Sequence, residues 1–146
     1  MLYIFIMKIE IELNEYDYQK LLKISSYNKL TKEDYVKLIV NKNLENNIYL
    51  NYGYVYDLDK KVLMHENNLI YLNNLEEQLF EYLIKNIDRY VSSNEIIENV
   101  VKSKPMSIFA MRNQIKKIRD KTHKDLIMVK SNIGYMINSL SINKVK

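Results

Sequence analysis

A strict alternation near the start of the chain constrains the fold more than any other feature. Residues 8–13 place three charged side chains on one face and three apolar ones on the other, a period of two that predicts a half-buried β-strand. Two runs with helical spacing follow, over residues 15–27 and 31–46. One strand has nothing to pair with in 46 residues, and so short a segment cannot bury enough apolar surface to fold alone. The pattern therefore predicts a dimer held by the apolar face of the strand: Ile9, Ile11 and Leu13.

The strand-helix-helix order of residues 7–46 resembles the ribbon-helix-helix family of the Arc, MetJ and CopG type. The resemblance implies two chains whose strands pair into a ribbon over four interlocked helices. Alternate strand side chains of that ribbon face DNA bases in the family, and the matching positions here are Lys8, Glu10 and Glu12. Two carboxylates per strand disfavour contact with phosphate-lined DNA. We therefore interpret this segment as a dimerisation module.

Charge is distributed unevenly along the chain. Residues 1–46 hold seven basic and seven acidic side chains, and residues 47–101 hold four basic and nine acidic ones, a net charge of −5. Residues 102–146 hold eleven basic and two acidic side chains, a net charge of +9. Such a basic region favours a polyanionic partner, because neutralising phosphates releases condensed counterions. A solvated basic face is the alternative.

The composition argues against several classes of enzyme. There is no cysteine, and His65 and His123 lie far apart, so neither a thiol nucleophile nor a usual metal-ligand spacing is present. Two glycines are too few for phosphate-binding loops. We expect no enzymatic activity, cofactor or metal. The apolar stretch at residues 1–7 is too short to span a bilayer and lacks signal-peptide features, so we expect a cytoplasmic protein.

The second half of the chain alternates short β-type runs with helical segments. Residues 47–51 are expected to be a linker, and the runs at 54–56, 62–64 and 69–72 predict a small antiparallel meander. Two helices should follow, the first capped by Asn74 and the second by Ser92.

A third helix is predicted over residues 107–122, after the only proline of the chain. Its apolar residues recur at spacings of three and four, and basic and amide side chains cover the rest. We expect an amphipathic helix with an exposed cationic face, followed by a hairpin that begins at Met128 and returns over residues 134–137. The apolar stripe consists of Ile108, Met111, Ile115 and Ile118.

Four sequence blocks make residues 52–138 resemble the DNA-binding domain of OmpR/PhoB-type response regulators. The family's L-T-x-x-E, V-S-R-E-x-L, I-x-x-L-R-x-K and G-Y motifs match, in order, residues 72–76, 91–96, 115–121 and 134–135. The resemblance implies a winged helix-turn-helix in which residues 107–122 form the recognition helix and enter the major groove of DNA.

The resemblance also implies which side chains would contact DNA. Gln114 and Lys117 match positions that commonly face bases or phosphates, and Asn113 can offer an amide to adenine. The other basic residues would hold phosphates, unless Arg119 ties the helix to the sheet. In the wing, Ser131 stands where the family has arginine. The full set of candidates is Arg112, Asn113, Gln114, Lys116, Lys117, Arg119, Lys121, Lys130 and Ser131.

These observations predict an α+β chain with a dimerisation module at 1–46, a linker at 47–51, a winged helix-turn-helix domain at 52–140 and a basic tail at 141–146. We expect a homodimeric, sequence-specific transcription regulator that binds double-stranded DNA. Phosphorylation control is not expected, because the receiver domain usual in the family has no room in 46 residues. The alternative is a protein-interaction or antitoxin-like module whose winged helix binds a protein.

Overall fold

The computed structural model describes residues 9–102 and 104–140. The chain divides into two compact units, an N-terminal unit that ends at Glu45 and a C-terminal unit that begins at Asn46. Lys8 and the expected tail at 141–146 lie outside the described residues. Each unit is described by itself.

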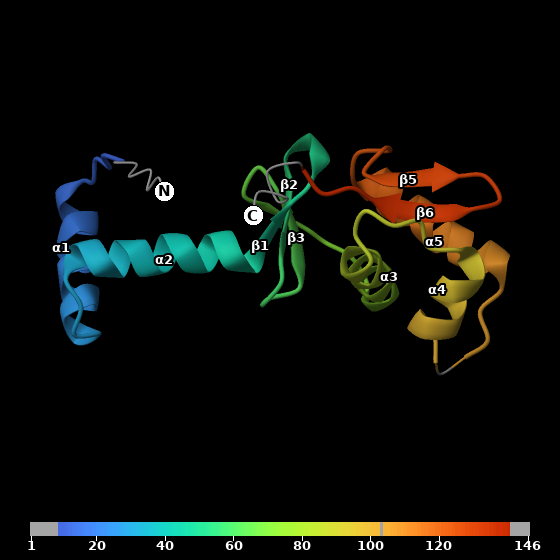
Figure 1. Ribbon diagram of the computed structural model, residues 1–146, viewed down its shortest axis with the longest axis horizontal. Helices are drawn as coiled ribbons and strands as arrows, with labels where there is room; N and C mark the ends of the chain where they lie inside the picture. The colour runs from blue at the N-terminus through green and yellow to red at the C-terminus, as the bar shows by residue number, and fades with distance from the viewer. Residues whose placement is uncertain (1–8, 103, 141–146) are drawn as a thin grey trace, which may run out of the picture. The chain divides into compact units, whose positions relative to one another are not determined.

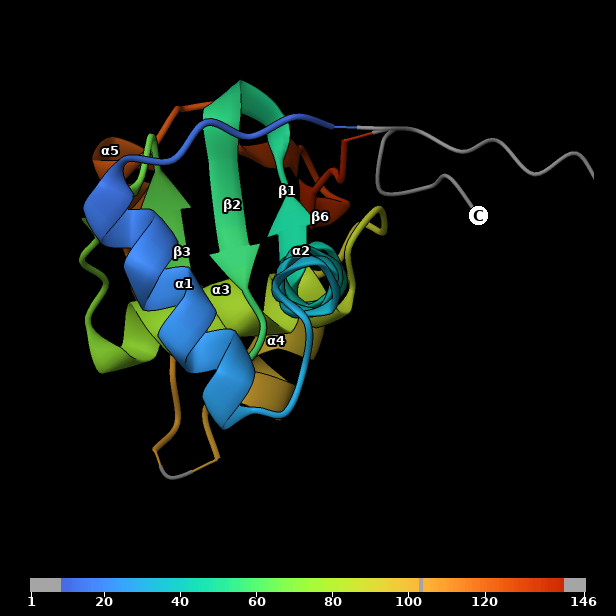
Figure 2. The same cartoon turned by 90° about the vertical axis from the view of Figure 1, so that its left-hand side faces the viewer.

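The N-terminal unit consists of two helices, α1 (Glu15–Tyr27) and α2 (Lys32–Asn46, whose last residue belongs to the C-terminal unit). Both predicted helix starts are confirmed. The Asn14 side chain accepts a hydrogen bond from the Asp17 N–H at 2.8 Å, and the Thr31 hydroxyl accepts one from the Asp34 N–H at 3.1 Å. Such caps satisfy N–H groups that have no partner inside the helix. The two helix axes are steeply inclined to each other (Figures 1 and 2).

The strand predicted at residues 8–13 is absent from the described part of that segment. Residues 9–14 have no regular structure, and Ile9, Ile11 and Leu13 are 76%, 60% and 45% exposed. The physical reason is that a strand needs a hydrogen-bonding neighbour, and the described residues of the N-terminal unit contain no other strand.

The C-terminal unit begins with an antiparallel four-stranded sheet. Its strands follow chain order: β1 (Asn47–Tyr49), β2 (Tyr54–Asp57), β3 (Val62–His65) and β4 (Asn68–Ile70). Figure 2 shows β2 between β1 and β3, as the register requires. Directly opposite residues on the four strands form one row that turns toward the core: Ile48, Tyr56, Leu63 and Ile70.

The prediction that residues 47–51 form a linker is wrong. Residues 47–49 form β1, Asn51–Gly53 form the short 3₁₀ helix η1, and Leu50 is fully buried between them. The backbone N–H of Leu50 donates to the Tyr54 carbonyl at 2.8 Å. The run is too short to show a strand period by itself, so its pairing with β2 decides its conformation.

Three helices and a hairpin complete the unit (Figure 1): α3 (Asn74–Lys85), α4 (Ser93–Val100), α5 (Ile108–Lys121), β5 (Ile127–Lys130) and β6 (Gly134–Ile137). The ring of Phe80 on α3 lies 5.6 Å from that of Tyr56, which joins helix to sheet. Buried side chains of all three helices and of the hairpin form one core, among them Leu79, Leu83, Ile96, Met111, Ile115, Ile118, Ile127 and Ile137.

The α3 helix begins one residue earlier than expected. Asn73, not Asn74, is the cap: its side chain accepts from the Glu76 N–H at 3.0 Å, and the Glu76 carboxylate accepts from the Asn73 N–H at 3.0 Å. The sequence offers a glutamate three residues after either asparagine, Glu76 after Asn73 and Glu77 after Asn74, and the reciprocal box forms at Asn73.

The hairpin is anchored to the segment between α3 and α4. Val91 and Tyr135 exchange two backbone hydrogen bonds, at 2.8 and 2.9 Å. Gly134 has a φ of +150°, and a Cβ atom there would overlap the Val91 carbonyl oxygen. Glycine is therefore required at this position because the two backbones approach so closely.

Candidate nucleic-acid interface

The buried face of α5 determines which of its side chains point outward. Ser107 caps it by accepting from the Ala110 N–H at 3.1 Å, and Met111, Ile115 and Ile118 are fully buried, as the predicted apolar stripe requires. Ile108, the first residue of that stripe, is instead 42% exposed because it stands in the first turn of the helix. The outward face carries Phe109, Arg112, Asn113, Lys116, Lys117 and Asp120.

Four of the predicted DNA contacts share this outward face. Arg112 and Lys117 have no ion-pair partner among the described residues, and Asn113 is exposed beside Arg112. Lys116 pairs with Asp120 at 2.6 Å, one helical turn away, and both side chains are mostly exposed. An exposed pair of this kind stabilises by only about 0.3–0.5 kcal/mol, so a phosphate can replace Asp120 at small cost.

Two other predicted contacts serve the fold. The Nε atom of Arg119 donates to the Lys124 carbonyl at 2.7 Å, which fastens the end of α5 to the following loop. The Nζ atom of Lys121 lies 2.6 Å from a Glu76 carboxylate oxygen, and Glu76 is only 1% exposed. The charge of Lys121 is thus matched by a buried carboxylate at the start of α3.

Gln114 lies at the border between the two faces of α5. Its side-chain oxygen is buried and has no hydrogen-bond partner among the described residues. Two-point contact with adenine needs both the oxygen and the nitrogen of an amide at the surface. The exposed Asn113 meets that requirement better than Gln114 does.

The wing consists of β5, β6 and the turn between them. Asn132 has a φ of +60°, a left-handed conformation that asparagine tolerates. Ser131 is exposed in the same turn. Lys130 is exposed beside it, with its Nζ atom 5.7 Å from the centre of the Tyr90 ring. The wing therefore presents one cation next to a small hydroxyl group.

An ion-pair cluster orients α4 against α3. The guanidinium of Arg89 donates to both carboxylate oxygens of Glu95, and the Tyr82 hydroxyl donates to Glu95 at 3.1 Å. The hydrogen bonds from Arg89 hold the pKa of Glu95 below its ordinary value. Ser92 caps α4 as predicted, through the Glu95 N–H at 3.1 Å.

Sequence reasoning missed one residue of the outward face. Phe109 stands in the first turn of α5 and is 74% exposed, although it is aromatic. The sequence could have indicated this exposure. Phe109 falls outside the apolar stripe and precedes Arg112 and Asn113 by three and four residues, which places all three on one face of the helix.

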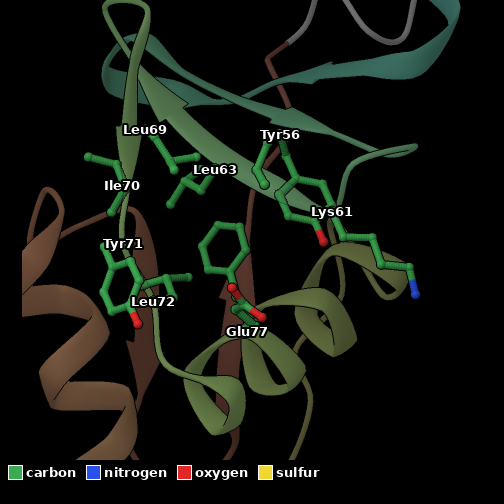
Figure 3. A pocket seen from close by; sticks show the side chains of 10 residues that line it. Tyr56, Lys61, Leu63, Leu69, Ile70, Tyr71, Leu72 and Glu77 are labelled. Carbon is green, nitrogen blue, oxygen red and sulfur yellow. The ribbon is translucent and has the colours of Figure 1, made fainter.

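A cavity of about 130 Å³ lies between the sheet and α3 (Figure 3). Its walls are mostly apolar side chains, including Leu63, Leu69 and Ile70. Burial raises the pKa of the Tyr56 hydroxyl to about 12, so this group stays protonated at neutral pH. Its lining holds no nucleophile with an adjacent base.

Among the described residues, no three metal-ligating side chains gather, and no helix is long and apolar enough to cross a membrane.

The sequence matches no family model and no curated protein. Solved structures do resemble the chain. The response regulator DrrB of Thermotoga maritima, an OmpR/PhoB homologue, superposes with a TM-score of 0.55 at 19% identity, covering 74% of this chain and 53% of DrrB. The match thus spans about half of DrrB. The DNA-binding domain of CpxR from E. coli gives a TM-score of 0.53 at 17% identity, over 64% of this chain and 96% of that domain.

A third structure is the DNA-binding domain of RstA from Klebsiella pneumoniae in complex with the RstA box, with a TM-score of 0.52 at 15% identity, over 63% of this chain and 96% of that one. Together with the sheet, three helices and hairpin described above, these matches decide the fold. The C-terminal unit is a winged helix. Along the chain, α5 is the third helix of this unit, and the β5–β6 hairpin follows it.

Proposed function

We propose that the protein is a homodimeric, sequence-specific DNA-binding transcription regulator, with α5 in the major groove. The observation that carries the proposal is the outward face of α5. Arg112, Asn113 and Lys117 are exposed there without any role in the fold, on the helix that corresponds to the recognition helix. Side chains that neither pack nor pair are available for a ligand.

The charge around this face fits a polyanion. Residues 102–146 carry a net charge of +9, and α5 itself contributes only one acidic side chain, Asp120. Neutralised phosphates supply affinity that does not depend on sequence. RstA, whose winged helix has the same fold, was solved on its own DNA box.

Roles can be assigned to the exposed side chains. Asn113 grips an adenine edge through its amide, while Arg112 and Lys117 contact guanine acceptors or phosphates. Lys116 holds a phosphate after exchanging Asp120 for it. Lys130 and Ser131 of the wing contact the adjoining backbone. We leave Gln114, Arg119 and Lys121 out of the interface because they are buried or bonded within the fold.

The dimer is assigned to the N-terminal unit. Ser25 is the only buried residue of its two helices, and α2 buries none, yet the unit exposes many apolar side chains. A chain segment that leaves so much apolar surface in water gains too little to stay folded alone. The exposed set comprises Ile9, Ile11, Leu13, Leu30, Leu38, Ile39, Val40 and Leu44.

A second copy of the chain is the partner that fits this surface. The alternation of residues 9–13 gives each copy a strand with one apolar face, and pairing two such strands supplies the hydrogen-bonding neighbour that each lacks. We therefore propose a ribbon-helix-helix arrangement in which one two-stranded ribbon and four helices share one core. Two winged helices linked in this way bind paired half-sites more tightly than either alone.

Selection of bound sequences from a random duplex pool, at two salt concentrations, tests the proposal. The wild type should enrich a repeated half-site, and the double variant Arg112→Glu/Lys117→Glu should enrich nothing. Lys20→Glu/Lys23→Glu on α1 is the matched control, because it changes the net charge equally at exposed positions outside the winged helix.

Two outcomes would contradict the proposal. Enrichment of the same motif by wild type and double variant would remove α5 from recognition. Binding that only fades with salt, without any motif, would leave phosphate contact alone and favour a protein partner for the basic face.

A further inference from the structure

The most unusual side chain on the outward face of α5 is apolar. Phe109 is 74% exposed in the first turn of the helix, while Met111, Ile115 and Ile118 already bury the opposite face. The fold gains little from an aromatic ring that stands mostly in water. Contact with a ligand would bury the ring, which the fold itself does not do.

The neighbours of Phe109 indicate which ligand. Arg112 and Asn113 follow it by three and four residues, so the three side chains share one strip of the helix surface. The first turns of a recognition helix are the part that reaches base edges in the major groove. Phe109 thus belongs to the surface that the proposed function places against bases.

Major-groove chemistry offers one apolar feature. Phosphates and sugars are polar, and the base edges display hydrogen-bond donors and acceptors, except for the C5-methyl group of thymine. An exposed phenyl ring beside one cation, Arg112, and one amide, Asn113, matches that methyl group and no other part of the groove. We propose that Phe109 determines specificity by packing on a thymine methyl group. This inference rests on the proposed function.

The spacing of the strip sharpens the proposal. Side chains four residues apart on a helix lie about 5–6 Å apart at their Cβ atoms, and base pairs stack at about 3.4 Å. The thymine contacted by Phe109 and the adenine contacted by Asn113 therefore lie within about two base pairs of each other. Each half-site should contain a short A·T segment.

The test compares two random duplex pools that are identical except that one contains deoxyuridine in place of thymidine. Uracil keeps every hydrogen bond of thymine and lacks only the methyl group. In the thymidine pool, the wild type should enrich a half-site with one fixed thymine, and Phe109→Ala should lose the preference at that position alone. Tyr71→Ala is the matched control, since Tyr71 is an equally exposed aromatic residue (79%) outside α5.

Affinity for the enriched duplex gives the decisive numbers. Replacing the fixed thymine by uracil should weaken wild-type binding about fourfold, the effect of one buried methyl group. The same replacement should leave Phe109→Ala unaffected, whereas Phe109→Leu, which keeps an apolar contact, should retain most of the discrimination. Thermal unfolding of each variant checks that the fold is intact.

Equal sensitivity of wild type and Phe109→Ala to uracil, or no sensitivity in either, would overturn the inference while leaving the DNA-binding proposal intact. If the wild type enriches no motif in either pool, the proposed function fails and this inference fails with it.

Discussion

The two units of this chain have similar local signals and very different cores. Helices in both begin at side-chain caps, Asn14 and Thr31 in the N-terminal unit and Asn73, Ser92 and Ser107 in the C-terminal unit. Every buried hydrophobic side chain among the described residues, however, belongs to the C-terminal unit. Caps and helical spacing are properties of a few neighbouring residues, whereas burial depends on what else the segment can reach.

The two units differ in whether a single chain covers their apolar side chains. The winged helix covers its own apolar faces through the row of sheet residues, three helices and the hairpin. The N-terminal helices have apolar side chains at helical spacing but nothing within the described unit to cover them. On this account, the winged helix is stable by itself and the N-terminal unit is stable only in a dimer.

Truncating one leucine in each unit should produce the largest contrast. Leu79→Ala, at a position with no exposure, should cost about 2–5 kcal/mol of unfolding free energy at every protein concentration. Leu44→Ala, 61% exposed in the single chain, should destabilise only the dimer and so make the loss concentration-dependent. Urea unfolding at two protein concentrations measures both. A Leu44→Ala effect that does not change with protein concentration would contradict the claim that the N-terminal unit is stable only in a dimer.

Two lysines of α5 should have different roles, one in the stability of the fold and one in DNA binding. Lys121→Met leaves the buried Glu76 carboxylate without its cation and should cost about 2 kcal/mol, with no change in the salt dependence of DNA binding. Lys117→Met should leave stability unchanged and lower the slope of log affinity against log salt by about 0.9. Thermal unfolding and salt titrations on one duplex distinguish them. The reverse pattern would mean that the assignment of the two side chains is wrong.

The smallest expected effect is a pH dependence inside the winged helix. Because the folded pKa of Glu95 is lowered below the ordinary 4.5, its bond to Arg89 stabilises the fold above that pH. The stabilisation is lost as pH falls through the lowered value. Partial exposure limits it to about 0.5 kcal/mol. Urea unfolding at pH 7 and pH 3 should show a smaller acid-induced loss for Glu95→Gln than for the wild type; equal losses would contradict the assignment.

Much of the winged helix was predictable because its signals are local. The helices, and the apolar stripe of α5 except for Ile108, were predicted from spacing and capping residues alone. Strand β1 was missed because a three-residue run acquires its conformation only by pairing with β2. Residues 9–13 form no strand for the same reason, since the described residues of the N-terminal unit offer no strand to pair with.

The candidate interface was predictable in outline only. Spacing placed Arg112, Asn113 and Lys117 on the outward face. It could not indicate that Lys121 pairs with Glu76, which is 45 residues away in sequence. Nor could it show that the Gln114 oxygen is buried, because that depends on the packing of α5 against the rest of the fold.

The molar mass of the chain in solution tests most directly the claim that a second copy completes the N-terminal unit. Light scattering should give twice 17.6 kDa for the wild type and for Glu12→Gln, which changes the polar face of the segment. Ile11→Asp, which places a charge in the proposed strand interface, should give a monomer that keeps a folded winged helix. A wild type that is monomeric at micromolar concentration, or an Ile11→Asp variant that stays dimeric, would contradict the account.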